Sequence, residues 1–291
     1  MDEPVELAQY KEAVSIAISE ITPDKLKAMV SDAKLLDLEK GGSGKGVSNK
    51  LGLISRSELD IVWSAHTIAP ITEFIKSRLA RRLRIVSRNQ QIDLYNLFSK
   101  SSQTRKICGT LFEAIGLCMV PEGLDITLLP MVRLPQNPNA KSHPRWYTSH
   151  ASLTNETLED QRQQALRRSE AIQFPPATTQ EFKADEILSL REGVFFVPVS
   201  ESQEALDAFL LVHGILYILQ FTVGQKHDIK PGFVKFLQKC QNVPPLEEWK
   251  FVFLIPPGTM LRCPEPKSEL PGLRKLNPYS AELDLRPYLN A

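Results

Sequence analysis

The sequence predicts an α/β fold, with helices on both sides of a mixed sheet, and two observations lead to this class. Residues 205–227, ALDAFLLVHGILYILQFTVGQKH, contain two runs of aliphatic and β-branched residues that meet at His213-Gly214, the pattern of a β-hairpin. Helical and strand-like patterns surround this hairpin and give the order αβββαβ. These flanking elements are a helix at about 103–119, a strand at 124–134, a helix beginning near Pro231 and a strand at 249–256.

The N-terminal part of the chain predicts a helical extension followed by a linker. Residues 5–38 have helical periodicity, with the start signal of a second helix at Thr22. Residues 40–50, KGGSGKGVSNK, have the composition of a flexible linker and lack the spacing of a phosphate-binding loop. The predicted domains are a helical extension and linker at 1–60 and an α/β domain at 61–291 with an insertion at about 135–190.

Residues 58–88 predict a helix with a cationic end. Six basic residues fall within thirteen positions of this segment: Lys76, Arg78, Arg81, Arg82, Arg84 and Arg88. One interpretation is a solvated helix face, which is what most charged runs are. The other is a nucleic-acid-binding surface, because Lys and Arg that neutralise phosphates supply most of the sequence-independent affinity.

Two helices separated by a break at Ser99–Ser102 are predicted for residues 91–118. The second helix carries an apolar side suited to burial, and Glu113 is its single acid. A lone Glu in such a helix is most often a surface residue or a salt-bridge partner, and a catalytic role is the alternative.

Three further segments are predicted to lie outside the αβββαβ order. Residues 135–190 are polar and contain proline, so we interpret them as an insertion with one helix near 155–172. The short apolar run GVFFVPV at 193–199 is set aside from the core. The proline-rich tail from Pro257 predicts an extended segment along the surface.

Composition is that of a globular protein, with 42% hydrophobic residues, 24% charged residues and a net charge of +1, which excludes neither nucleic-acid nor protein partners. No apolar run approaches the roughly 18–20 residues that cross a bilayer, and the acidic N-terminus has no signal-peptide pattern. The four cysteines lie far apart without a CxxC motif, which argues against zinc and for reduced thiols. We therefore expect an intracellular protein, cytoplasmic or nuclear, with no membrane partner.

Polar residues occupy the predicted hairpin at positions where a purely structural sheet element would be apolar. We place Asp207 on the first strand, and Gln220 and Thr222 at alternate positions of the second, so that these two share a face. Lys226 and His227 follow where the second strand ends. An acid beside a polar-x-polar pair is the geometry with which sheet nucleases hold a divalent metal.

Several short motifs follow one another along the chain: Thr104-Arg105…Gly109…Phe112-Glu113, then Leu206-Asp207-Ala208-Phe209, then Gln220-Phe221-Thr222 and His227. Together with the αβββαβ order, over about residues 70–257, they resemble the restriction-endonuclease-like, PD-(D/E)XK, superfamily. The motifs are most similar to the nuclease-like domain of fungal Crinkler and RHS-type proteins. That family often places a P-loop NTPase before this domain, and this sequence contains no such pattern.

The resemblance implies a metal-dependent DNA nuclease, an effector or toxin domain that acts in a nucleus. In this chemistry Mg²⁺ is bound by carboxylates and activates the attacking water. By position, Asp207 would be the central metal ligand, Glu113 the supporting acid and Gln220 the second ligand. Thr222 would take the place of the usual lysine, and Lys226 or His227 would supply a base or a cation.

Two of these residues depart from the parent pattern and leave a second hypothesis open. The side-chain carbonyl of Gln220 is a neutral and weaker ligand than a carboxylate, and Thr222 has no charge. The alternative is therefore a catalytically inactive module on the same fold, which binds nucleic acid or protein or has a structural role.

Overall fold

The computed structural model describes residues 5–20, 22, 52–56, 66–70, 82, 88–99, 105–133, 145–148, 156–183, 185–199, 206–264, 276 and 278–285. The chain divides into two units, Met1–Ile115 and Gly116–Ala291. In the described part of the chain, no helix is both long and apolar enough to span a membrane.

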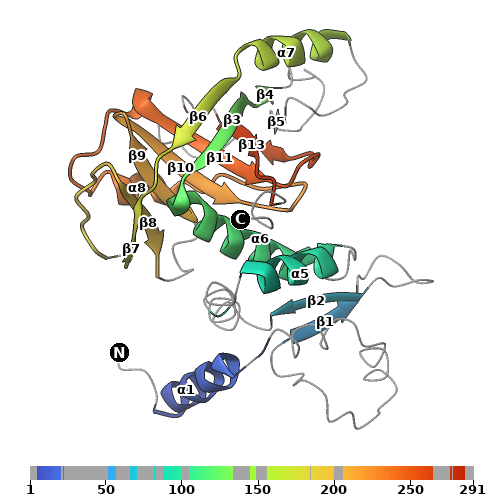
Figure 1. Ribbon diagram of the computed structural model, residues 1–291, viewed down its shortest axis with the longest axis vertical. Helices are drawn as coiled ribbons and strands as arrows, with labels where there is room; N and C mark the ends of the chain where they lie inside the picture. Colours follow the sequence, from blue (N-terminus) through green and yellow to red (C-terminus); the bar gives the residue numbers. More distant parts are fainter. Residues whose placement is uncertain are drawn as a thin grey trace. The chain divides into compact units, whose positions relative to one another are not determined.

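The first unit contains helices and a two-stranded sheet (Figure 1). The predicted first helix is confirmed as α1, whereas the predicted second helix after Thr22 and the 40–50 linker lie outside the described residues. The elements of this unit are α1 (Val5–Ser19), β1 (Gly52–Arg56), β2 (His66–Pro70), α5 (Arg88–Ser99) and the start of α6 (Arg105–Met119).

The prediction of one helix over residues 58–88 is wrong at residues 66–70. These residues form strand β2, which pairs along its whole length with β1 in an antiparallel arrangement. Thr67 and Ile68 are β-branched and favour a strand, and Pro70 occupies the end of an edge strand, where its missing N–H is tolerated. Among the six cations, the backbone of Arg82 is helical and Arg88 begins α5, while Lys76, Arg78, Arg81 and Arg84 lie outside the described residues.

The predicted pair of helices around Ser99 is confirmed. Helix α5 ends at Ser99 and α6 begins at Arg105. The rings of Tyr95 on α5 and Phe112 on α6 lie 6.0 Å apart, and burial raises the pKa of Tyr95 to about 12.

The second unit is built on one curled, mixed sheet with the strand order β6-β3-β13-β11-β10-β9-β8-β7 (Figure 1). Strands β13, β11 and β10 run parallel, β10, β9 and β8 form an antiparallel meander, and β7 is parallel to β8. On the other side, β3 is antiparallel to both β13 and β6. The strands are β3 (Leu124–Pro130), β6 (Glu170–Phe174), β7 (Thr178–Phe182), β8 (Val194–Pro198), β9 (Ala208–Val212), β10 (Ile215–Phe221), β11 (Trp249–Ile255) and β13 (Pro278–Glu282).

A smaller sheet and short helices complete this unit. The small sheet has the order β12-β5-β4, with antiparallel pairing throughout. These elements are β4 (Val132–Arg133), β5 (Arg145–Tyr147), β12 (Arg262–Pro264), α7 (Glu156–Arg167), α8 (Gly232–Leu237) and the 3₁₀ turns Val120–Glu122 and Leu246–Glu248. The α/β class, with a mixed sheet flanked by helices, is therefore confirmed, as are the hairpin β9–β10, the strands β3 and β11, and helices α7 and α8.

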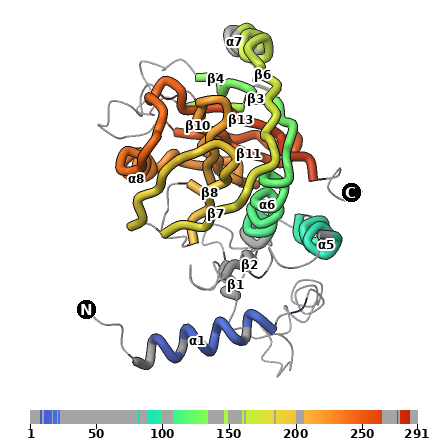
Figure 2. Tube along the Cα trace, turned by 60° about the vertical axis from the view of Figure 1, so that its left-hand side comes forward, coloured from blue at the N-terminus to red at the C-terminus, as the bar shows by residue number. Residues whose placement is uncertain are grey.

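The two faces of the large sheet are covered by different elements. We call the face with Ile218 and Phe251 the α8 face, because Phe233 of α8 packs there with its ring 5.3 Å from that of Phe251. We call the face with Phe221 the α6 face. A Cβ atom added to Gly116, in the last turns of α6, would lie 2.2 Å from the Phe221 ring. Figure 2 shows α8 on one side of strands β10 and β11, with β6 on the other.

Two edge strands come from the segment that we predicted to be an insertion. Strands β6 and β7 lie at the two ends of the large sheet, and each buries only its last residue, Phe174 or Phe182. An edge strand with one buried side chain has no alternating apolar pattern to detect. The run at 193–199, which was set aside from the core, forms strand β8 between β7 and β9.

The prediction that the tail from Pro257 only wraps the surface is wrong for residues 278–282. Strand β13 lies inside the sheet, between β3 and β11, and Ser280 and Ala281 are fully buried. The segment PYSAE is short and its central side chains are small, so its apolar content is too low to signal a buried strand.

Candidate functional site

The carboxylate of Asp207 holds the two strands of the hairpin together. Asp207 comes directly before β9, not within it as predicted, and its backbone N–H donates to the carbonyl of Leu219 over 3.1 Å. The backbone N–H of Phe221 donates to Asp207 Oδ2 over 2.6 Å. A short, charge-assisted bond of this kind is among the stronger hydrogen bonds in proteins. One carboxylate oxygen therefore has a structural partner.

Gln220 and Thr222 are both buried at the end of β10. Strand alternation assigns both to the α8 face, whereas Phe221 between them contacts the α6 face. The N–H of Thr222 donates to the carbonyl of Leu254 over 3.0 Å, which continues the pairing with β11. The Thr222 hydroxyl accepts the N–H of Gly224 over 3.1 Å, so this oxygen closes the turn after the strand.

A row of aligned residues crosses the sheet at the end of β10: Asp207, Gln220, Phe253 and Ser280. The pairing of Leu219 with Ala208 makes Gln220 and Asp207 the next pair, and the register continues from Gln220 to Phe253 and Ser280. Ser280 Oγ is fully buried and has no hydrogen-bond partner within the described part of the structure. Sequence analysis missed this hydroxyl because it missed strand β13.

His227 and Lys226 point to opposite sides of the segment after β10. The ring of His227 lies 5.8 Å from the ring of Phe253, which belongs to the row, and its Nδ1 lies 3.2 Å from the carbonyl of Asp228. Lys226 is exposed and forms a parallel bridge with Arg262. Alternation therefore turns Lys226 away from the row while His227 faces it.

Glu113 lies on α6, partly exposed, in the first unit, whereas Asp207, Gln220 and Thr222 lie in the second. The part of α6 that belongs to the second unit meets the sheet at Phe221, on the face opposite to Gln220. The convergence of Glu113 with the other three residues stays a prediction.

The chemistry of the row does not by itself fit a magnesium ion. Mg²⁺ prefers an octahedral set of oxygen ligands that includes carboxylates. In the row and Thr222 together, the one carboxylate is that of Asp207, and its Oδ2 already accepts a hydrogen bond from a backbone amide. The described residues contain no group of three or more His, Cys, Asp or Glu side chains that could hold a metal.

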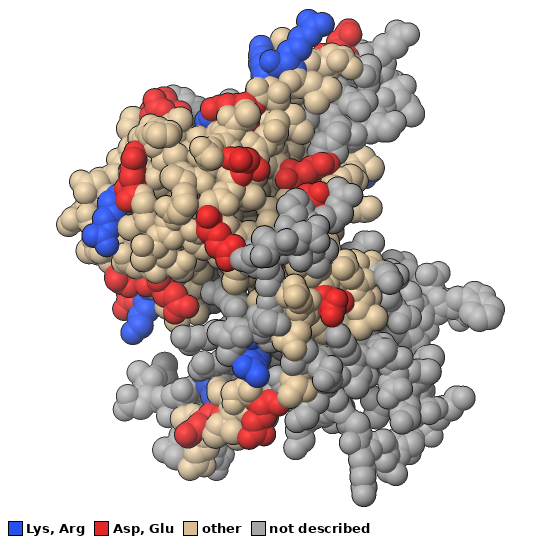
Figure 3. Space-filling model, viewed as in Figure 1, with Lys and Arg blue, Asp and Glu red and all other residues tan. Residues whose placement is uncertain are grey.

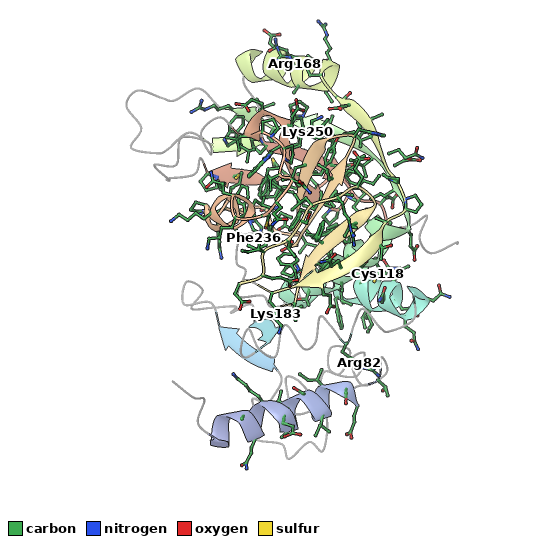
Figure 4. All side chains as sticks on the ribbon, turned by 90° about the vertical axis from the view of Figure 1, so that its left-hand side faces the viewer. Arg82, Cys118, Arg168, Lys183, Phe236 and Lys250 are labelled. Atoms are coloured by element: carbon green, nitrogen blue, oxygen red, sulfur yellow. The ribbon has the colours of Figure 1, made fainter. Side chains whose placement is uncertain are left out.

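A second polar cluster lies on the α6 face, and we call it the lysine cluster: Lys250, Tyr217, Tyr279 and Glu170. Lys250, labelled in Figure 4, forms an ion pair with Glu170 of β6. Its Nζ also lies 5.7 Å from the ring centre of Tyr217 and 5.6 Å from that of Tyr279. Burial, helped by Glu170 and Tyr279, raises the pKa of Tyr217 to about 12.

The lysine cluster also shows how strongly the sheet curls. The ring centres of Phe174 on β6 and Tyr217 on β10 are 5.1 Å apart, edge to face. Four strand spacings separate β6 from β10, about 19 Å in a flat sheet. The curl therefore folds β6 over the α6 face. Sequence analysis missed the cluster because its members come from a strand, the predicted insertion and the tail.

Three comparisons with known proteins were made, and none finds a match: no family model, no curated protein and no solved structure resembles this chain closely enough to be reported.

Proposed function

We propose that this protein binds nucleic acid and does not cleave it with the residues at the end of strand β10. The observation that supports binding over cleavage is the use of the Asp207 carboxylate and the Thr222 hydroxyl as acceptors for backbone amides. A metal site needs these oxygens for the ion, whereas here they hold the hairpin and the turn that follows it. Binding requires only cations on a stable fold.

The fold that we propose beneath this function is the restriction-endonuclease-like core, in the form found in Crinkler and RHS-type proteins. The chain order α6, β3, β9, β10, α8, β11 supports it, since this is αβββαβ. Strands β6, β7, β8 and β13 of the large sheet are additions to that order; β13 lies inside the sheet next to β11, and β3 pairs with β13 and β6 and not with β9.

The cations of residues 76–88 are the proposed main contact with phosphates. On the face drawn in Figure 3, the basic and acidic residues of the described part are interspersed and form no continuous basic patch. The proposed contact rests on the sequence, in which six cations fall within thirteen residues.

Binding is tested by fluorescence anisotropy with a labelled DNA duplex over a series of salt concentrations. If three or four cations reach phosphates, the plot of log K against log salt has a slope of about −3. Replacement of Arg81, Arg82 and Arg84 by Glu should weaken binding and make the slope shallower. The matched control reverses the charge of three exposed cations of the second unit, Arg191, Lys235 and Lys239.

Binding that does not depend on salt, or equal losses in both triple variants, would contradict the proposed contact surface. The second result would mean that total charge, and not residues 76–88, determines the affinity.

Cleavage is tested by incubating the protein with supercoiled plasmid and Mg²⁺ or Mn²⁺, and we expect no nicking. Asp207→Asn is the informative variant, because its amide oxygen can still accept the N–H of Phe221 but carries no charge for a metal. If the wild-type protein nicks plasmid and Asp207→Asn does not, the site is a working metal centre and the proposal of binding without cleavage fails.

A further inference from the structure

Two exposed cations lie side by side after the end of strand β10. Lys226 and Arg262 are the partners of a parallel bridge. The backbone fixes this pairing on both sides, since Arg262 N–H donates to the carbonyl of Gln225 over 2.9 Å and His227 N–H donates to the carbonyl of Arg262 over 3.1 Å. Bridge partners project to the same side of a sheet, so the two cationic side chains share one face.

The neighbours of this pair do not neutralise it. Within the described part of the chain, neither Lys226 nor Arg262 forms an ion pair. The nearest acid in sequence, Asp228, is exposed, and among the described residues it forms no ion pair with either cation. Like charges directly opposite each other on paired strands repel and cost free energy.

An aromatic ring holds one of the two cations in place. The guanidinium carbon of Arg262 lies 5.8 Å from the centre of the Tyr147 ring on the neighbouring strand β5. A cation–π contact leaves the edge of the guanidinium able to donate hydrogen bonds. A side chain positioned in this way loses less conformational entropy when it binds a ligand.

We propose that Lys226 and Arg262 form a phosphate-binding pair that contacts the backbone of a nucleic acid. Arginine offers a planar fork that matches two phosphate oxygens, and lysine offers a compact charge beside it. Two neighbouring phosphodiesters, one for each cation, supply the negative charge that the pair lacks. This inference rests on the proposed function and adds a second contact surface, made of residues separate from those at 76–88.

The test uses the full-length chain with both residues changed, Lys226→Gln and Arg262→Gln. Each phosphate of B-DNA that the protein no longer neutralises reduces the steepness of the salt slope by about 0.9, so the double variant should be shallower than wild type by about 1.8. The matched control is Lys235→Gln with Lys239→Gln, which removes two exposed charges on and just after α8 and should leave the slope unchanged.

Two further variants keep the test informative if the double variant folds poorly. Lys226→Gln alone changes one exposed side chain and should reduce the steepness by about 0.9. Arg262→Lys keeps the charge but removes the fork and the stacking on Tyr147, so the slope should persist while the affinity falls.

The outcomes separate this inference from the function on which it rests. Wild-type binding together with an unchanged slope in the variants overturns the phosphate-binding pair and leaves the proposed function standing. If the wild-type chain binds no nucleic acid at any salt concentration, both proposals fail.

Discussion

The two faces of the large sheet bury polar groups in different ways. On the α8 face, Asp207 and Thr222 accept hydrogen bonds from backbone amides, while Ser280 Oγ has no partner among the described residues. On the α6 face, the charge of Lys250 meets a carboxylate and two aromatic rings. Adjacent residues of the same strands point to opposite faces and therefore have different kinds of partners.

This difference shows why polar residues in a sheet do not by themselves define a reactive site. A buried polar group costs free energy unless it is hydrogen-bonded, so the structure supplies partners from whatever is near. In this way the polar groups of Asp207 and of the lysine cluster already have partners within the protein. The exposed cations Lys226 and Arg262 form no ion pair among the described residues, so they are better candidates for contact with a ligand.

The largest effect is expected from tighter packing on the α6 face. In Gly116→Ala the new Cβ would lie 2.2 Å from the ring of Phe221, which is buried. We expect the free energy of unfolding to fall by about 2–3 kcal/mol, more than the gain of about 1 kcal/mol from helix propensity. Denaturant unfolding measures the change.

A second variant identifies the cause of that destabilisation. Adding Phe221→Leu to Gly116→Ala removes the clashing ring atoms and should recover part of the stability that the single Gly116→Ala change removes, a non-additive pair of effects. A stabilised Gly116→Ala protein would show that α6 and β10 do not approach so closely.

The next effect concerns pH and the lysine cluster. The pKa of Tyr217 is raised from 10.0 to about 12, so its neutral form is favoured in the folded protein. The corresponding stability is fully present below pH 10 and is lost as the pH rises from 10 to about 12, by at most about 2.7 kcal/mol.

We therefore expect Tyr217→Phe to lose less stability than wild type over this pH window, as followed by denaturant unfolding at each pH. Tyr95→Phe should reduce the loss of stability in the same pH window, because the pKa of Tyr95 is also raised to about 12. Parallel pH curves for wild type and Tyr217→Phe would rule out a buried Tyr217 hydroxyl.

The smallest effect is expected on the α8 face. Ser280→Ala removes a buried hydroxyl without a partner among the described residues, so we expect stability to rise by about 1 kcal/mol or to stay unchanged. Thr148→Val is the control, because its buried Oγ1 accepts the N–H of Leu261 over 3.4 Å and its removal should destabilise the protein. A clear loss of stability in Ser280→Ala, seen by thermal unfolding, would reveal a partner for this hydroxyl.

Elements with a strong local pattern could be predicted from the sequence. The hairpin β9–β10 has a tight turn in which both His213 and Gly214 have positive φ, as a two-residue hairpin loop requires. Strand β11 and helix α6 carry continuous or periodic apolar residues. Strands β6, β7 and β13 are short and bury few large side chains, so their existence depends on partners far away in the sequence.

The candidate site, like the fold, could be predicted from the sequence only in part. Alternation predicts that Gln220 and Thr222 share one face, because it depends only on the strand period. It does not say which backbone amide reaches the Asp207 carboxylate, nor that β6 curls over Tyr217. Those contacts join residues 14 to 80 positions apart, and local patterns contain no information about them.

The position of β13 also governs how the sheet can be completed during synthesis. This strand is the last of the eight along the chain, yet it lies between β3 and β11. At about 5–20 residues per second, roughly one to five seconds pass between the translation of Ile255 and that of Glu282. Until β13 pairs with them, β3 and β11 each have an unpaired edge, the kind of surface that recruits other chains into aggregates. The five residues of β13 thus join the pair β6–β3 to the other five strands and cover both open edges.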